Sequence, residues 1–183
     1  MSALVIGIIL LSVMGWLGYT FNRFIRHRNL VREAWSGVDV QLKRRHDLVP
    51  RLVECVQGYK GYEASLLERL TLARNRAQTA RSVMESGEVE TGLAQNLRSL
   101  LAVAEAYPDL KASRTFQELS AALIEVEDQL QYARRYYNGT VRDFNILAES
   151  FPSGLVARLF GFRSAEFFEI ESSIERQAVE VKL

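Results

Sequence analysis

Residues 3–21 read ALVIGIILLSVMGWLGYTF, and no charged side chain occurs before Arg23. At about 1.5 Å per residue this run makes roughly 28 Å of helix, which matches the hydrocarbon core of a bilayer. A buried core helix and a cleaved signal peptide are the alternatives. A signal peptide carries basic residues before its apolar run and a small-residue cleavage site after it, whereas Tyr19-Thr20-Phe21-Asn22 follows here. We therefore expect a retained, helical anchor over residues 1–22.

The charges beside the anchor predict its orientation. Four arginines come soon after the apolar run, namely Arg23, Arg26, Arg28 and Arg32. The positive-inside rule keeps such a flank in the cytoplasm. We expect a single-pass protein of the bacterial inner membrane, with its N-terminus outside and the rest of the chain cytoplasmic. The rings of Trp16 and Tyr19 would then lie at the cytoplasmic headgroups.

The composition limits what the cytoplasmic part does. The chain has 23 Lys and Arg against 22 Asp and Glu, for a net charge of +1. That balance predicts no basic face and so no nucleic-acid partner. Cys55 is the only cysteine, so no intramolecular disulfide forms, in keeping with a reducing compartment.

The apolar residues from Arg23 to Gln57 recur with the period of one helix face. Arg45 is the exception, because it is a charged residue at a position where the pattern predicts an apolar side chain. Nothing separates this helix from the anchor, so we expect one continuous rod. Two places for its end remain open. The chain turns either at Pro50, within the first turn of a new helix, or at Gly58 and Gly61.

Three more helices follow by the same criterion. The second runs from Tyr62 to about Met84 and ends at Glu85-Ser86-Gly87, and the third carries Leu93 to Tyr107 and ends at Pro108. The fourth opens with Thr115-x-x-Glu118, a capping-box pattern, and its apolar stripe passes through Asn138-Gly139 unbroken. The prediction is an all-α protein, in which the N-terminal transmembrane helix precedes an antiparallel four-helix bundle of long helices over residues 23–168. Residues 169–183 are expected to form an acidic, mobile tail.

Polar side chains are concentrated in the first and fourth helices. An ion pair between Asp39 and an arginine of the fourth helix would hold the two helices in register. The candidates for that arginine are Arg134, Arg135 and Arg142. A solvated face is the alternative for these residues.

Motifs of known catalytic chemistry are absent from the sequence. The two histidines, His27 and His46, are not preceded by Glu at the spacing of a di-iron bundle, and no zinc-protease or phosphate-binding motif occurs. The His46-Asp47 pair is more typical of capping and surface charge than of proton transfer. We expect no enzyme, no metal site and no cofactor.

Four sequence motifs resemble the LemA family of bacterial membrane proteins. They are EAWSGVDVQLKRRHDLVPRLVECVQGY at 33–59, EAYPDLKAS at 105–113, ARRYYNGTVRDFN at 133–145 and FPSGLVARLFGF at 151–162, with Phe-Phe-Glu at 167–169. The resemblance covers about residues 28–169 and is not expected to extend into the acidic tail. It implies an N-terminal transmembrane helix, a cytoplasmic helical bundle and no established enzymatic activity. It also implies a link to envelope stress and to membrane proteases.

Together these features predict a membrane-anchored scaffold or adaptor that self-assembles as a homo-oligomer and serves envelope maintenance or stress. Its partners would be lipid and a membrane protease or another envelope protein. The alternative is a metal-binding or enzymatic bundle. Residues 154–168 are either core or a second membrane contact, which would use Arg158, Phe160, Phe162 and Arg163.

Overall fold

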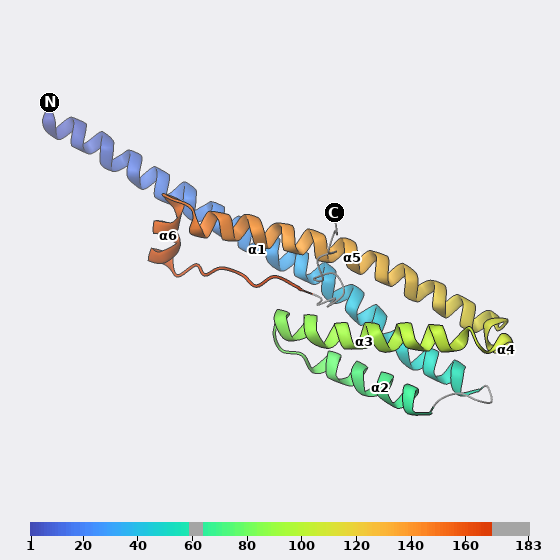
Figure 1. Ribbon diagram of the computed structural model, residues 1–183. Coiled ribbons are helices and arrows are strands. Elements are labelled where there is room, and N and C mark those ends of the chain that lie inside the picture. The colour runs from blue at the N-terminus through green and yellow to red at the C-terminus, as the bar shows by residue number, and fades with distance from the viewer. Residues whose placement is uncertain (59–63, 170–183) are drawn as a thin grey trace, which may run out of the picture. The chain divides into compact units, whose positions relative to one another are not determined.

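The computed structural model describes residues 1–58 and 64–169, and in these ranges the chain is helical without strands. The all-α prediction is therefore confirmed. The helices are α1 (Ser2–Gln57), α2 (Ala64–Thr79), α3 (Val83–Ala104), α4 (Pro108–Lys111), α5 (Arg114–Glu149) and α6 (Ser153–Phe160) (Figure 1). The acidic tail lies outside the described residues except for Glu169, so the prediction that it is mobile stays a prediction.

The chain divides into two compact units. Unit 1 comprises Met1–Val38 and Ala133–Glu166, and unit 2 comprises Asp39–Tyr132 and the chain from Phe167. The long helices α1 and α5 each contribute to both units. That the long helices form one antiparallel bundle stays a prediction, because the two units are described separately.

Helix α1 continues through Pro50 and ends at Gln57. Of the two places considered for its end, the structure excludes Pro50. The buried residues Val49 and Leu52, on either side of Pro50, belong to the same core. The apolar face is thus in phase across the proline, and its burial outweighs the hydrogen bond that a proline removes from a helix.

Unit 1 is built on an antiparallel pairing of α1 with α5. Phe24 contacts Phe144 edge-on with ring centroids 6.1 Å apart, and Trp35 contacts Tyr137 at 5.2 Å. Higher numbers on α1 thus meet lower numbers on α5, which fixes the antiparallel direction. Helix α6 completes the core through Val156.

An extended segment after α6, residues 162–166, is tied to α5 by hydrogen bonds between its backbone and side chains of α5. The Asn145 carboxamide accepts from the Ala165 N–H at 2.7 Å and donates to the Ala165 carbonyl at 3.0 Å. The Tyr137 hydroxyl donates to the Glu166 carbonyl at 2.9 Å. These side chains replace the regular partners that a non-helical backbone lacks.

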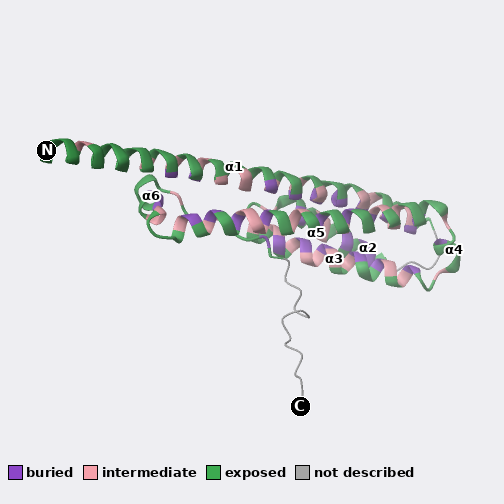
Figure 2. Cartoon of the chain, turned by 90° about the horizontal axis from the view of Figure 1, so that it is seen from above, coloured by how far each residue is buried: buried purple, intermediate pink, exposed green. Residues whose placement is uncertain are grey.

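Unit 2 has an apolar core to which five helices contribute. The fully or nearly fully buried members are Val49, Leu52 and Val56 of α1, Leu66, Leu67, Leu70 and Ala77 of α2, Leu93, Leu97, Leu100 and Ala104 of α3, Leu110 of α4, and Phe116 and Leu123 of α5. The alternation of buried and exposed faces along each helix follows the predicted period (Figure 2).

The predicted boundary between the second and third helices is wrong. Helix α3 begins at Val83, so Glu85-Ser86-Gly87 lies in its first turns rather than at a helix end. The Ser82 side chain accepts from the Glu85 N–H at 3.1 Å, and the Glu85 carboxylate accepts from the Arg81 N–H at 2.7 Å. Ser82-x-x-Glu85 is itself a capping signal in the sequence, and it overrides the turn tendency of Gly87.

The start of the last long helix also differs from the prediction. Helix α5 begins at Arg114, and the Ser113 hydroxyl accepts from the Phe116 N–H at 3.4 Å, so Thr115 is not the cap. Glu118 pairs with Arg114 one turn away at 2.8 Å. The helix then passes through Asn138 and Gly139, as the unbroken stripe predicts.

Candidate functional site: a membrane anchor and a buried ionic cluster

The N-terminal part of α1 is long and apolar enough to cross a membrane, and only 6% of its most apolar window is buried. The core helix of a soluble protein would be mostly covered by its neighbours, whereas this stretch is exposed on all sides (Figure 2). A helix that shows apolar side chains in every direction matches a lipid environment. The predicted anchor is therefore a candidate membrane span by structure as well as by composition.

The residues predicted at the headgroups lie at the end of this span. Trp16 and Tyr19 are 37% and 64% exposed. The Arg23 guanidinium lies 6.0 Å from the centre of the Tyr19 ring, and Arg26 is exposed. An aromatic ring beside a cation suits the polar edge of a bilayer.

An aromatic cluster joins α1 to α6 within unit 1. The Phe21 ring lies 4.9 Å from the Phe160 ring, and Phe24 stacks on Phe162 at 4.6 Å with the planes 12° apart. The Arg28 guanidinium lies 5.6 Å from the Phe162 ring. Phe162 is thus packed in the core of this unit, while Phe160 remains 51% exposed. Arg158 and Arg163 are exposed.

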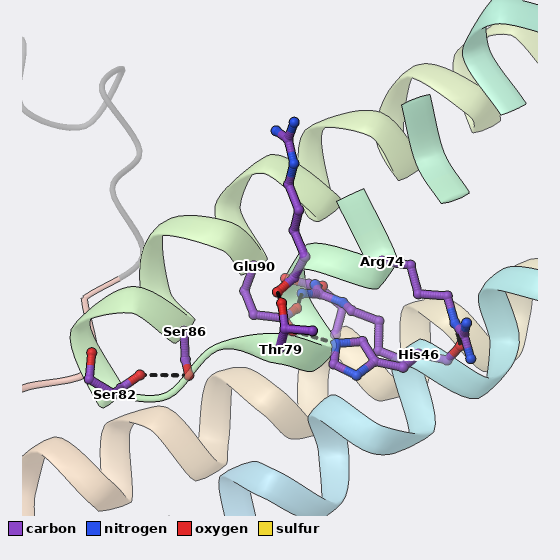
Figure 3. Close-up of polar contacts among 9 residues, drawn as sticks. His46, Arg74, Thr79, Ser82, Ser86 and Glu90 are labelled. Atoms are coloured by element: carbon purple, nitrogen blue, oxygen red, sulfur yellow. Dashed lines mark hydrogen bonds and ion pairs between the residues drawn. The ribbon is translucent and has the colours of Figure 1, made fainter. Parts of the chain in front are cut away.

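A buried ionic cluster lies in unit 2. Arg45 of α1 is 0% exposed, and its Nη1 lies 3.0 Å from Oε2 of Glu90 on α3. Its Nη2 pairs with Glu127 of α5. The other Glu90 oxygen lies 2.5 Å from Nε2 of His46, as Figure 3 shows for the two labelled residues.

Arg45 keeps its positive charge although burial removes the guanidinium from water. Burial lowers the pKa of Arg45 from its ordinary value, and the carboxylate of Glu90 opposes that effect. The positive charge of Arg98 lowers the pKa further. Because an arginine begins with a very high pKa, the side chain remains a cation at neutral pH and needs its acidic partners.

Within the cluster, the carboxylate of Glu90 has a partner at each oxygen, whereas the buried Nε of Arg45 has none among the described residues. Both oxygens of the Glu90 carboxylate are engaged by Arg45 and His46. The His46 carbonyl also accepts from Nε of Arg74 on α2, at 2.8 Å (Figure 3). The expectation that His46 is a capping or surface residue is wrong, because it is 7% exposed and pairs with Glu90.

Arg45 is visible in the sequence as a charge within the apolar stripe, but its partners are not. Glu90 and Glu127 come from helices whose register against α1 is set only by packing. Arg45 itself was the sequence signal for a buried ion pair, because a cation on a buried helix face requires a carboxylate from a neighbouring helix.

The residues predicted to form an interhelical pair have other contacts within each unit. Asp39 accepts a salt bridge from Lys43 one turn away at 2.8 Å, and its side chain is 47% exposed. Arg142 lies 3.7 Å from Asp143, and its side chain is 68% exposed. Arg134 is half-buried and Arg135 exposed. The pairing of Asp39 with one of these arginines stays a prediction.

No group of three or more His, Cys, Asp or Glu side chains in residues 1–58 and 64–169 is arranged to hold a metal ion. Cys55 is half-buried beside the core of unit 2. A thiol in such surroundings packs as a small apolar group.

Comparison with known proteins gives concordant results. The family model described as LemA family matches residues 34–183. Protein LemA of Metamycoplasma hominis is 28% identical over 161 residues, which cover 87% of this chain and 73% of that protein. Magnetosome protein MamQ 2 of Paramagnetospirillum magneticum is 23% identical over 175 residues, 81% of this chain and 64% of that protein. The expectation that the resemblance ends before the acidic tail is wrong, because the family match reaches residue 183.

Proposed function

We propose, from the premise that this chain belongs to the LemA family, that it is a membrane-anchored scaffold or adaptor on the cytoplasmic face of the bacterial inner membrane. In this proposal the protein assembles with copies of itself and serves envelope maintenance or stress. It would do so by holding a partner, such as a membrane protease or another envelope protein, at the membrane. No reaction is part of the proposal.

The observation that carries the proposal is the continuity of α1. A single helix runs from the exposed apolar stretch at Ser2 to Gln57, and its last turns supply Leu52 and Val56 to the core of unit 2. The same helix therefore carries both the candidate membrane span and residues of the unit 2 core. This continuity of the chain suits a folded part that is held at a membrane.

The basic flank supports a cytoplasmic location for the folded part. Arg23 and Arg26 are exposed next to the span, and positive charge on that side opposes translocation. The free cysteine agrees with this location, because Cys55 forms no disulfide.

Self-assembly is supported by apolar side chains left exposed on α5. Ile124 and Ile146 are 58% and 56% exposed, and Tyr136 is 56% exposed. Large apolar residues at the surface of one long helix suit a contact with a second copy.

The pairing of Glu90 within the ionic cluster supports a structural role for this carboxylate over a catalytic one. Glu90 is the most buried carboxylate among the described residues, and both of its oxygens have partners. A general acid or base needs an open position for substrate within hydrogen-bond reach.

Orientation is tested by fusing a reporter after Leu183 of the full chain. A reporter that is active only in the cytoplasm should be active. As a control, replacing Arg23, Arg26 and Arg28 by Glu should lower that activity, because these charges set the orientation. Labelling of the C-terminus by an impermeant reagent in intact cells would contradict the proposal.

The scaffold role is tested by purifying the full chain in a mild detergent and measuring its mass and metal content. We expect a homo-oligomer larger than a dimer, a stable co-purifying envelope protein and no stoichiometric metal. A monomer over a wide concentration range would overturn self-assembly. Stoichiometric iron, zinc or manganese would favour the metal-binding alternative.

A further inference from the structure

Helix α6 has one face inside unit 1, and among the described residues the side chains of its other face are half or more exposed. Val156 and Ala157 are 0% and 2% exposed and pack in the core with Phe24 and Phe144. On the outer side Leu155 and Leu159 remain 59% and 71% exposed, Phe160 51%, and Phe151, just before the helix, 87%. Four large apolar side chains exposed together on and just before a short helix form an apolar patch, and such patches mark sites of interaction.

The position of α6 decides which environment this outer face meets. The Phe160 ring lies 4.9 Å from the ring of Phe21, the last residue of the apolar run. Helix α6 therefore lies beside α1 at the end of the membrane span, and it runs crosswise to α1 (Figure 1). An amphipathic helix crossing the direction of a span lies in the plane of the bilayer surface, where its apolar face enters the boundary between headgroups and chains.

The charges around α6 match the same surface. Arg158 on α6 and Arg163 just after it are exposed, and no acidic residue occurs between Glu149 and Glu166. The exposed Arg23 and Arg26 lie on α1 just beyond the span. A local surplus of arginine beside exposed aromatic and aliphatic side chains is complementary to anionic headgroups.

We propose that the outer face of α6, formed by Leu155, Leu159 and Phe160 with Phe151 before it, is a second membrane contact that inserts into the cytoplasmic leaflet beside the span of α1. Arg158 and Arg163 bind anionic headgroups there. The inference rests on the proposed function, because it requires that α1 is a membrane anchor. It narrows the sequence-based expectation, because Phe162 points into the unit and serves the core instead.

Such a contact gives each protomer two attachments to the membrane. The span alone fixes depth but allows rotation about its axis. A second attachment off that axis stops the rotation and sets which face of α1 and α5 is turned to a neighbouring copy.

The test uses the full chain, with Cys55 replaced by Ser, in vesicles of phosphatidylcholine and phosphatidylglycerol. Single cysteines carry an environment-sensitive fluorophore at three exposed positions, through Leu159→Cys on α6, Met14→Cys in the span and Gln95→Cys on α3. Brominated lipid and aqueous iodide are the two quenchers. We expect the label at 159 to be quenched by brominated lipid at least half as strongly as the label at 14, while the label at 95 responds only to iodide.

Every other pattern overturns the inference in an identifiable way. If the label at 159 responds to iodide as the label at 95 does, the outer face of α6 is in water. If it is shielded from both quenchers, a second copy or a protein partner covers it. If the label at 14 is not quenched by lipid, the anchor fails and the proposed function fails with it.

A pair of variants separates membrane contact from folding. Leu155→Ser with Leu159→Ser, read from a label at Phe151→Cys, should reduce lipid quenching severalfold and leave the helical circular dichroism and the melting temperature unchanged. Phe162→Ser should lower the melting temperature, because that ring stacks on Phe24. A loss of helicity in the Leu155 and Leu159 variant would show that this face is core, and the inference would be wrong.

Discussion

Nη1 of Arg45 lies 3.0 Å from Oε2 of Glu90, and the two side chains are 0% and 1% exposed. The pair joins α1 to α3, and Glu127 extends it to α5. A buried charge pair adds less to stability than apolar residues of the same volume, but loss of one partner leaves an isolated charge in the core. The pair therefore specifies which helices meet, and at which register, more than it strengthens their contact.

Glu90→Ala should lower the free energy of unfolding by about 3 kcal/mol, because Arg45 and His46 then lose their shared partner. The measurement is urea unfolding in a mild detergent, followed by far-ultraviolet circular dichroism. Glu88→Ala is the control, since Glu88 is exposed on the same helix and its loss should change the value by under about 0.5 kcal/mol. Equal effects of the two changes would contradict the buried pairing.

Gly87 and Gly92 on α3 should respond to alanine with opposite signs. A Cβ at Gly87 would collide with the backbone carbonyl of Glu169, whereas one at Gly92 would meet nothing. Inside a helix, alanine is normally more stable than glycine by about 0.5–1 kcal/mol. We expect Gly92→Ala to gain roughly that amount and Gly87→Ala to lose stability, both measured by urea unfolding. A gain at both positions would mean that Glu169 does not pack on α3.

Asp39→Ala should leave the melting temperature unchanged within error. Its only ion pair in unit 2 among the described residues is the exposed one with Lys43, and exposed pairs of this kind add little. The hydrogen bond with Asp39 raises the pKa of Lys43, so the variant should also lower that pKa toward its ordinary value. A large drop in melting temperature would instead support the predicted pairing with an arginine of α5.

Tyr137 should ionise at a higher pH than an ordinary tyrosine. Burial raises its pKa, and the negative charge of Glu166 adds to the effect. Since the unfolded chain loses this proton first, at about pH 10, the stability tied to Tyr137 is complete below that pH and falls as the pH rises through the folded pKa. The check is a tyrosinate absorbance titration of the protein minus that of Tyr137→Phe. A difference curve centred at or below about pH 10 would refute this.

Much of the architecture could be predicted from local pattern. The apolar run at 3–21, the helical period of Val49, Leu52 and Val56, and the unbroken stripe through Asn138-Gly139 each predict the observed helices. These features are determined locally because a helix closes its own hydrogen bonds, and because the period of 3.6 residues alone decides which side chains share a face. The errors at Gly87 and Thr115 arose because two local signals competed. The capping signal at Ser82 competed with the turn tendency of Gly87, and Ser113 competed with Thr115 as the helix cap.

The remaining features depend on contacts between residues distant in sequence. Arg45 is visible in the sequence as an anomaly, but its pairing with Glu90 follows from how α3 packs on α1. In the same way, Phe160 and Phe162 are two residues apart in one motif, yet packing against Phe24 places Phe162 in the core and leaves Phe160 half-exposed. The sequence by itself determined that the chain is helical, which side chains share a helix face, and that the first helix is apolar enough to cross a membrane. Only the tertiary structure decided which charges are buried together and which face of α6 is left exposed, because burial depends on neighbouring helices and not on a residue's own segment.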